Sequence, residues 1–482
     1  DAASARLDRV SSPGGVLDGQ EEIQAELRAT LGATYKRLGQ RDEAIRHLTI
    51  AVDTWSRLRG EAAPETIRAK GELAIAWLDQ GDSQVAERLN TEALAAAEAS
   101  LSPDDPVRLT VLHDRASLLI WAGRLEEARP VVDAAIEGRR RALGPEHLDT
   151  LVSLQTLAFW HERTGEYEQA EQLCTWLVEA FSRVQGPEHP DTLLMMNNLA
   201  TLYDSMGKSA QGEPLLRRIV EVRSRVLGPD HPNTLVSVSN LAYCLDLLER
   251  NDEAEQLYRQ VLDARRARFG ADHPQTLLSL NNLASLLDET GRGDEAEPML
   301  RELVEVRRRV FGVDHPDTII AINNLAVRYL RQGRHDEAIA GFIEARDASI
   351  RLNGQDDPGT LNATNNLAFT YLRAGRHEES EALFREAVES ARRTLPPDHF
   401  FLGVLMGSHG AALSALERLD EAEQTLLEGY RIASEALGAE HGRCQTIAAH
   451  LMRLYRKRDR EAPDQGFAEK AEHWRALAGD QG

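Results

Sequence analysis

A period of 42 residues constrains this chain more than any other feature of its sequence. Histidine recurs at this interval or a multiple of it, at His147, His189, His231, His273, His315, His399 and His441. Aspartate occupies the same column at 105 and 357, and alanine at 63, and no insertion interrupts the count. A strict period of this length is typical of a repeat array, in which each unit buries its apolar face on its neighbours.

Each repeat has the pattern of a helical hairpin. In the repeat 189–230, apolar residues at helical spacing run from Thr192 to Met206, and a second amphipathic run extends from Glu213 to Leu227. A glycine, here Gly207, follows the first run and another follows the second, as C-terminal caps would. The proline of the H-P-D-T string suits the first turn of the next helix, because its missing N–H needs no partner there. The sequence therefore predicts an all-α chain of about eleven hairpins.

Two columns of small residues predict how each hairpin closes. One lies in the first helix, for example at Ala200 and Ala242, and the other lies in the second, at Gly212 and Ala254. Small residues allow two helix backbones to approach closely. A bulky side chain in either column should destabilise the fold by about 1–3 kcal/mol through overpacking.

The strings NNLA, G-R-x-x-E-A-E and H-P-D-T make the chain resemble tetratricopeptide repeat (TPR) proteins, in the 42-residue form typical of kinesin light chains and many bacterial proteins. The resemblance covers about residues 21–460. It implies a right-handed superhelical solenoid. It says little about the partner, because this module serves unrelated proteins.

The regions outside this array have different patterns. Residues 1–20, with the stretch Ser11–Gly15, are expected to form a linker or flexible arm. After Tyr455 the 42-residue count fails, because KRDREAPDQG precedes the helical string FAEKAEHWRALA. We expect residues 461–482 to form a C-terminal capping helix and tail.

Composition narrows the classes of partner and compartment. A net charge of −22 disfavours nucleic acid or an anionic membrane as the main partner. No apolar run approaches the length of a membrane span. Cys174, Cys244 and Cys444 are scattered and suit buried positions in a reducing compartment. These features predict a cytoplasmic protein that binds a protein or peptide and holds no cofactor.

The histidine column does not predict a metal site. Equivalent residues of neighbouring repeats should lie about 8–10 Å apart, whereas the ligands of one zinc ion each lie about 2 Å from it. We expect these histidines to cap loops instead. The chain also contains no catalytic signature such as H-E-x-x-H or G-x-S-x-G, which argues against an enzyme.

A column of asparagines is the strongest candidate for function. Asparagine is a mediocre helix former, so its repetition in register needs a reason. The column consists of Asn198, Asn240, Asn282, Asn324 and Asn366, often with a second asparagine just before it. In the resembled family this column faces a concave groove, where its amides hold the backbone of a bound peptide. The alternative is that the amides tie neighbouring helices together. We expect a tie for the first asparagine of each pair and the groove for the second.

Other residues on the same helix face extend this candidate groove. Tyr243, Val327 and Phe369 could form side-chain pockets. Arg328, Arg331 and Arg373 would make one half of the groove basic and favour acidic residues in the ligand, whereas Asp204, Asp246 and Asp288 edge the other half.

The sequence leaves three functions open. The first is a scaffold that binds an extended peptide in the groove. The second is a regulatory or sensor region of a larger enzyme, because such arrays resemble the tails of bacterial serine/threonine protein kinases. A catalytic domain preceding Asp1 would favour this second function. The third is a sensor of a small signalling peptide.

Overall fold

The computed structural model describes residues 2–11, 15–463 and 465–479. Residues 1 and 12–14 of the expected N-terminal arm, and 464 and 480–482 of the expected C-terminal segment, lie outside the described residues. The chain forms two compact units, Asp1–Glu249 and Arg250–Gly482. Each unit is described by itself.

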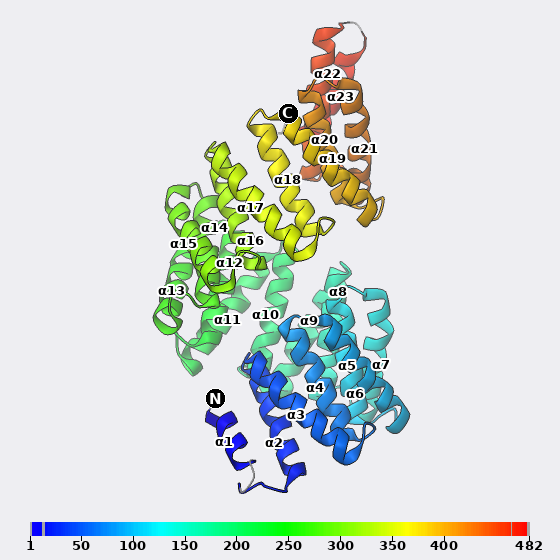
Figure 1. The fold of residues 1–482 in the computed structure, drawn as a ribbon, viewed down its shortest axis with the longest axis vertical. Helices are drawn as coiled ribbons and strands as arrows, with labels where there is room; N and C mark the ends of the chain where they lie inside the picture. The colour runs from blue at the N-terminus through cyan, green and yellow to red at the C-terminus, as the bar shows by residue number, and fades with distance from the viewer. Residues whose placement is uncertain (1, 12–14, 464, 480–482) are drawn as a thin grey trace. The chain divides into compact units, whose positions relative to one another are not determined.

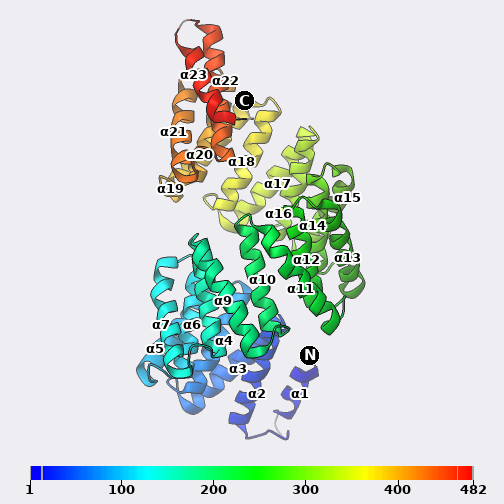
Figure 2. The same ribbon diagram turned by 180° about the vertical axis from the view of Figure 1, so that it is seen from behind.

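All regular elements of the described residues are helices, which run in successive antiparallel pairs within each unit (Figure 1 and Figure 2). The helices of unit 1 are α1 (Ala2–Val10), α2 (Glu21–Arg37), α3 (Arg41–Arg59), α4 (Pro64–Gln80), α5 (Ser83–Ser100), α6 (Pro106–Trp121), α7 (Leu125–Leu143), α8 (Leu148–Arg163), α9 (Tyr167–Gln185), α10 (Pro190–Ser205), α11 (Ser209–Leu227) and α12 (Pro232–Leu247). The helices of unit 2 are α13 (Asn251–Phe269), α14 (Pro274–Glu289), α15 (Gly293–Phe311), α16 (Pro316–Arg331), α17 (His335–Asn353), α18 (Pro358–Arg373), α19 (His377–Thr394), α20 (Phe400–Ala415), α21 (Leu419–Leu437), α22 (Gly442–Glu461) and α23 (Phe467–Ala478).

The prediction of an all-helical array of hairpins is confirmed. Even-numbered helices from α2 onward are the first helices of the hairpins, and odd-numbered helices from α3 onward are the second. The second helix begins earlier than its apolar pattern indicates, since α11 starts at Ser209 rather than at Glu213. The short turn around Gly207, whose φ is +68°, is enough to reverse the chain.

Consecutive hairpins are joined by a loop in which every residue of the H-P-D-T string has a role. The Nδ1 atom of His189 accepts the backbone N–H of Asp191 at 3.3 Å, and Pro190 occupies the first turn of α10. The Thr192 hydroxyl donates to the carbonyl of Gly186 at 2.8 Å. The same histidine cap occurs at all seven histidines of the column. The expected capping role of these histidines is therefore confirmed.

Close contact between the two helices of a hairpin depends on the small-residue columns. Ala200 on α10 is fully buried, and a Cβ atom added to Gly212 on α11 would lie 3.1 Å from its carbonyl oxygen. In unit 2, a Cβ atom at Gly410 would lie 2.5 Å from Leu426 Cγ. A Cβ atom at Gly212 would require a small shift of the α10 backbone, and one at Gly410 would require the Leu426 side chain to move. Both agree with the overpacking expected from the sequence.

The N-terminal residues include a helix that their sequence pattern does not indicate. In α1, Asp8 forms an ion pair with Arg28 at 2.9 Å and another with Arg46. The Ser4 hydroxyl donates to Glu43 at 3.0 Å, and the Leu7 side chain is buried. Polar contacts with the first hairpin thus position this helix. None of the helices described is long and apolar enough to cross a membrane.

The turn at Glu417 provides a test of the repeat geometry. Glycine ends the first helix in most repeats with a positive φ, but Glu417 adopts φ +63°. A left-handed conformation is unfavourable for a residue with a Cβ atom, so we expect Glu417→Gly to raise the free energy of unfolding by about 0.5–1 kcal/mol. Urea unfolding would measure this change.

Two controls separate conformation from charge in that experiment. Glu417→Ala also removes the exposed ion pair with Lys457 but keeps the strained φ, so it should not stabilise. Gly375→Ala, at the equivalent turn with φ +77°, should destabilise by about 1 kcal/mol. Equal stability of the Gly and Ala variants at position 417 would contradict this explanation.

Candidate functional site

Three of the five predicted asparagines tie neighbouring first helices together. An amide N–H of Asn240 on α12 donates to Oδ1 of Asn197 on α10 at 2.7 Å. In unit 2, Asn366 donates to Asn323 at 2.9 Å and Asn324 donates to Asn281 at 3.3 Å. Both asparagines of a pair therefore take part in ties, one to each neighbouring repeat. The expected division, with only the first asparagine structural, does not describe these three residues.

The other two predicted asparagines are half-buried. The amide nitrogen of Asn198 on α10 donates to the sulfur of Met195 at 3.9 Å. Asn198 forms no amide tie among the described residues of unit 1. A thioether sulfur is a weak acceptor, so the amide can exchange its contact with Met195 for one with a ligand. For Asn198 and Asn282 the role in peptide binding remains a prediction.

The predicted basic stretch is largely neutralised within unit 2. Arg328 is 12% exposed and forms ion pairs with Asp288 at 3.1 Å and with Asp294 at 3.2 Å. Arg331 pairs with the same Asp288 carboxylate. Of the three predicted arginines, only Arg373 is exposed and has no ion pair among the described residues. The positive charge available to an acidic ligand is therefore smaller than the sequence suggests.

The predicted pocket side chains differ in exposure. Tyr243 in unit 1 is 52% exposed and Phe369 in unit 2 is 37% exposed, so both can contact a ligand. Val327 instead packs against the buried cluster around Phe342.

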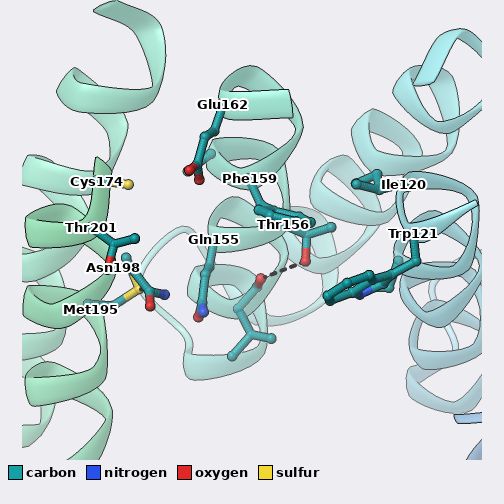
Figure 3. Close-up of a pocket in the computed structure, with 13 residues that line it drawn as sticks. Ile120, Trp121, Gln155, Thr156, Phe159, Glu162, Cys174, Met195, Asn198 and Thr201 are labelled. Carbon is teal, nitrogen blue, oxygen red and sulfur yellow. Dashed lines mark hydrogen bonds between the residues drawn. The ribbon is translucent and has the colours of Figure 1, made fainter. Parts of the chain in front are cut away.

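A pocket of about 420 Å³ lies among the first helices α6, α8 and α10 of unit 1, with Cys174 contributed by the second helix α9 (Figure 3). We call the surface formed by these three first helices the first-helix face. The pocket is lined by Ser117, Ile120, Trp121, Val152, Gln155, Thr156, Ala158, Phe159, Glu162, Cys174, Met195, Asn198 and Thr201. It thus contains one predicted site residue, Asn198.

Many other lining residues occupy the predicted columns in earlier repeats. Trp121 stands in the column of Arg331, Phe159 in that of Phe369, and Thr156 in that of Asn198. The sequence analysis missed them because it followed asparagine, which is absent from this column in the first four hairpins. Counting back from the predicted residues in steps of 42 would have found them.

An aromatic pair forms one wall of the pocket. The rings of Trp121 and Phe159 lie 5.8 Å apart between centroids and are tilted by 43°. Trp121 is 64% exposed, which is unusual for so large an apolar surface. The Arg163 guanidinium lies 5.9 Å from the Phe159 ring centroid, so this wall already attracts one cation. The pair provides a flat apolar surface for a ligand side chain.

A carboxylate lies on the next turn of α8 from Phe159 (Figure 3). Glu162 is half-buried, and its carboxylate forms no ion pair or hydrogen bond with any side chain that the structure describes. Burial raises its pKa, and the neighbouring Arg163 charge opposes this rise. Burial and the Glu162 charge together raise the pKa of Cys174 to about 12, so this thiol stays protonated.

Carboxylates replace asparagine in two earlier repeats of unit 1. Glu72 on α4 and Asp114 on α6 stand in the asparagine column, and Glu72 forms an ion pair with Lys36. Burial, with the neighbouring Glu72 charge, raises the pKa of Asp114 to about 7, although Lys36 and Arg139 oppose the rise. The acidic character of this helix face therefore extends beyond the pocket.

Helical-hairpin repeats with these loops and small-residue columns define the fold as a tetratricopeptide-type array. The Tetratricopeptide repeat family model matches residues 24–99, 107–177, 157–211, 205–267, 240–306, 275–349, 321–393 and 359–435. These matches cover most of the sequence, and the chain belongs to the tetratricopeptide repeat family. No curated protein matches the chain in sequence.

Several solved structures are similar to the chain at low sequence identity. A putative kinesin light chain with nearly identical TPR-like repeats from Podosopora anserina is 24% identical, with a TM-score of 0.40 over 43% of this chain and 100% of its own. BtubC from P. vanneervenii is 20% identical, with a TM-score of 0.43 over 48% of this chain and 92% of its own. The apo quorum sensor NprR from B. thuringiensis is 13% identical, with a TM-score of 0.50 over 85% of this chain and 99% of its own.

Mutation should affect stability differently for an asparagine that forms an amide tie and for one that does not. Asn240→Ala removes an amide tie and leaves the Oδ1 atom of Asn197 without its donor, so we expect a loss of about 1 kcal/mol in unfolding free energy. Asn198→Ala removes no tie, and alanine is the better helix former, so its stability should be unchanged or slightly higher. Chemical denaturation of both variants measures the difference. Equal losses would show that Asn198 is also structural.

Asp114 predicts a pH-dependent stability. Its carboxyl has an ordinary pKa of 3.8 in the unfolded chain and about 7 in the folded protein, so its contribution is most favourable below 3.8 and is lost as pH rises toward 7. Asp114→Asn removes this loss. Because the residue is only half-buried, we expect a gain of about 1–2 kcal/mol at pH 8 and a smaller gain at pH 5. Urea unfolding at the two pH values tests this, and a gain that is independent of pH would contradict it.

Proposed function

We propose that this protein is an interaction scaffold that binds an extended polypeptide segment of a partner protein along the first-helix face of unit 1. The observation that carries the proposal is the pocket on this face, where the exposed Trp121 lies beside Phe159. The family is built for binding, since its stacked hairpins present continuous extended surfaces.

The lining of the pocket suits a peptide better than a small metabolite. Gln155 and Asn198 each carry an amide that can donate to a peptide carbonyl and accept from a peptide N–H. They project from neighbouring first helices (Figure 3), so they can contact successive parts of one segment. The aromatic pair then accepts a side chain from that segment.

A sensor of a small signalling peptide, which the sequence also leaves open, would bind its ligand on the same face. The sequence-based alternative, a regulatory region of a larger enzyme, would use the same face to hold another part of that enzyme.

Selection from a random library of linear dodecapeptides would test the proposal. We expect the full chain to enrich peptides whose affinity falls about tenfold or more in the double variant Phe159→Ala/Asn198→Ala, because these residues contact the segment directly. Fluorescence polarisation of the labelled peptides measures the affinity.

Tyr167→Ala serves as the matched control in that experiment. Tyr167 is a 39% exposed aromatic residue on α9, in the same hairpin as Phe159 but outside the pocket lining. Its replacement should leave the affinity unchanged. If the enriched peptides bind the double variant as well as the wild type, the first-helix face is not the binding site.

A further inference from the structure

The pocket on the first-helix face contains one carboxylate without an ion pair among the described residues. Of its thirteen lining residues, which all belong to the described part of unit 1, Glu162 is the only acidic residue, and no lysine, arginine or histidine is among them. Its carboxylate has no ion-pair partner among the described side chains, and the chain as a whole carries a net charge of −22. A half-buried carboxylate without a partner is unfavourable in the unliganded protein. A cation that enters the pocket would relieve this cost.

The aromatic wall favours the same charge. Trp121 and Phe159 present π faces, which attract cations and are stronger partners where water is excluded. Phe159 already lies within 5.9 Å of one guanidinium, that of Arg163. Arg163 is not among the lining residues, so the interior of the pocket remains open to a second cation.

At the equivalent position in unit 2, the chain itself supplies positive charges that pair with the carboxylate. Asp288 stands in the column of Glu162, three repeats later, and pairs with Arg328 and Arg331. In unit 1 the column continues to Asp204, whose pKa is raised by burial and which has no ion pair among the described residues. Glu162 and Asp204 therefore have no ion pair of the kind that Asp288 forms with two arginines.

We infer that the pocket is the subsite for a basic side chain, arginine or lysine, of the bound segment, with its cationic group at the Glu162 carboxylate and the rest of the side chain along the Phe159 ring, which lies between Glu162 and Trp121 in Figure 3. This inference rests on the proposed function only in that a peptide carries the cation. Arginine fits the pocket particularly well, because its planar guanidinium stacks on aromatic rings and pairs with a carboxylate in the same plane. The volume of about 420 Å³ accommodates such a side chain with part of its backbone.

The test uses three capped tripeptides as probes, acetyl-Ala-X-Ala-amide with X as arginine, citrulline or glutamate. Citrulline has nearly the shape of arginine but no charge. The full chain is labelled with 5-fluorotryptophan, which gives up to six fluorine signals, and Trp121→Phe assigns the signal of the pocket. Titration followed by fluorine NMR then reports binding at Trp121 itself.

We expect the arginine probe to shift the Trp121 signal with an affinity about tenfold higher than the citrulline probe, because only arginine adds a charge-assisted contact and a cation–π contact. The glutamate probe should bind more weakly than either. In Glu162→Gln the preference for arginine over citrulline should fall to twofold or less. Glu179→Gln, which removes a charge from an exposed site on α9, should retain the tenfold preference.

Equal affinity for arginine and citrulline in the wild type would overturn the inference. So would an arginine preference that persists in Glu162→Gln, or the absence of any response at Trp121. The comparison of probes needs no change to the protein, so it stands even if a variant folds poorly.

Failure of this inference is distinct from failure of the proposed function. Library peptides that require Phe159 and Asn198 but show no dependence on a basic residue would leave the function intact and remove the basic subsite. Arginine binding at Trp121 without any enriched dodecapeptide would leave the basic subsite intact and contradict the proposed function.

Discussion

A buried hydrogen bond between consecutive hairpins fixes the geometry on which the rest of the array depends. The Thr192 hydroxyl is fully buried and donates to the carbonyl of Gly186, and Thr150 does the same to Gly144, both at 2.8 Å. The glycine turns the chain with a positive φ, and the threonine satisfies a carbonyl at a helix end that would otherwise lack a partner. Donor and acceptor are six residues apart in each case, so an insertion in this loop would break the bond. This constraint fixes the length of the loop between hairpins wherever the threonine forms the bond.

The asparagine column shows that one position can have different roles in different repeats. Asn240 forms a tie because the preceding repeat supplies Asn197 as its acceptor. The residue that corresponds to Asn197 one repeat earlier is Gln155, and Asn198 forms no tie to it among the described residues. Both amides instead line the pocket. The pocket on the first-helix face thus lies next to the repeat in which the amide ties between neighbouring first helices stop.

The fold could be predicted from the sequence because it depends on local and periodic features: helical spacing, glycine caps and small-residue columns. The face of the candidate site could also be predicted, since every 42-residue step preserves the direction of a side chain. The roles of the individual residues could not be predicted in this way. Whether Arg331 offers a charge to a ligand depends on Asp288, which lies one repeat away and takes up that charge. The exposure of Trp121 likewise depends on which residues surround it, and periodicity alone does not report this.

The fold itself does not require a carboxylate at the position of Glu162. The same column holds Ile120 one repeat earlier, and it holds Leu330 and Leu372 in unit 2, so an apolar residue is compatible with the packing of a first helix. In a solenoid each repeat packs mainly on its neighbours, so the unfavourable burial of one charge is not offset by a distant part of the molecule. Glu162 lines the same pocket as an aromatic pair that attracts cations. The fold tolerates an apolar residue at this position, yet Glu162 is a carboxylate without an ion pair, and Trp121 in the same pocket is exposed. A ligand cation explains these features together better than a contribution to stability does.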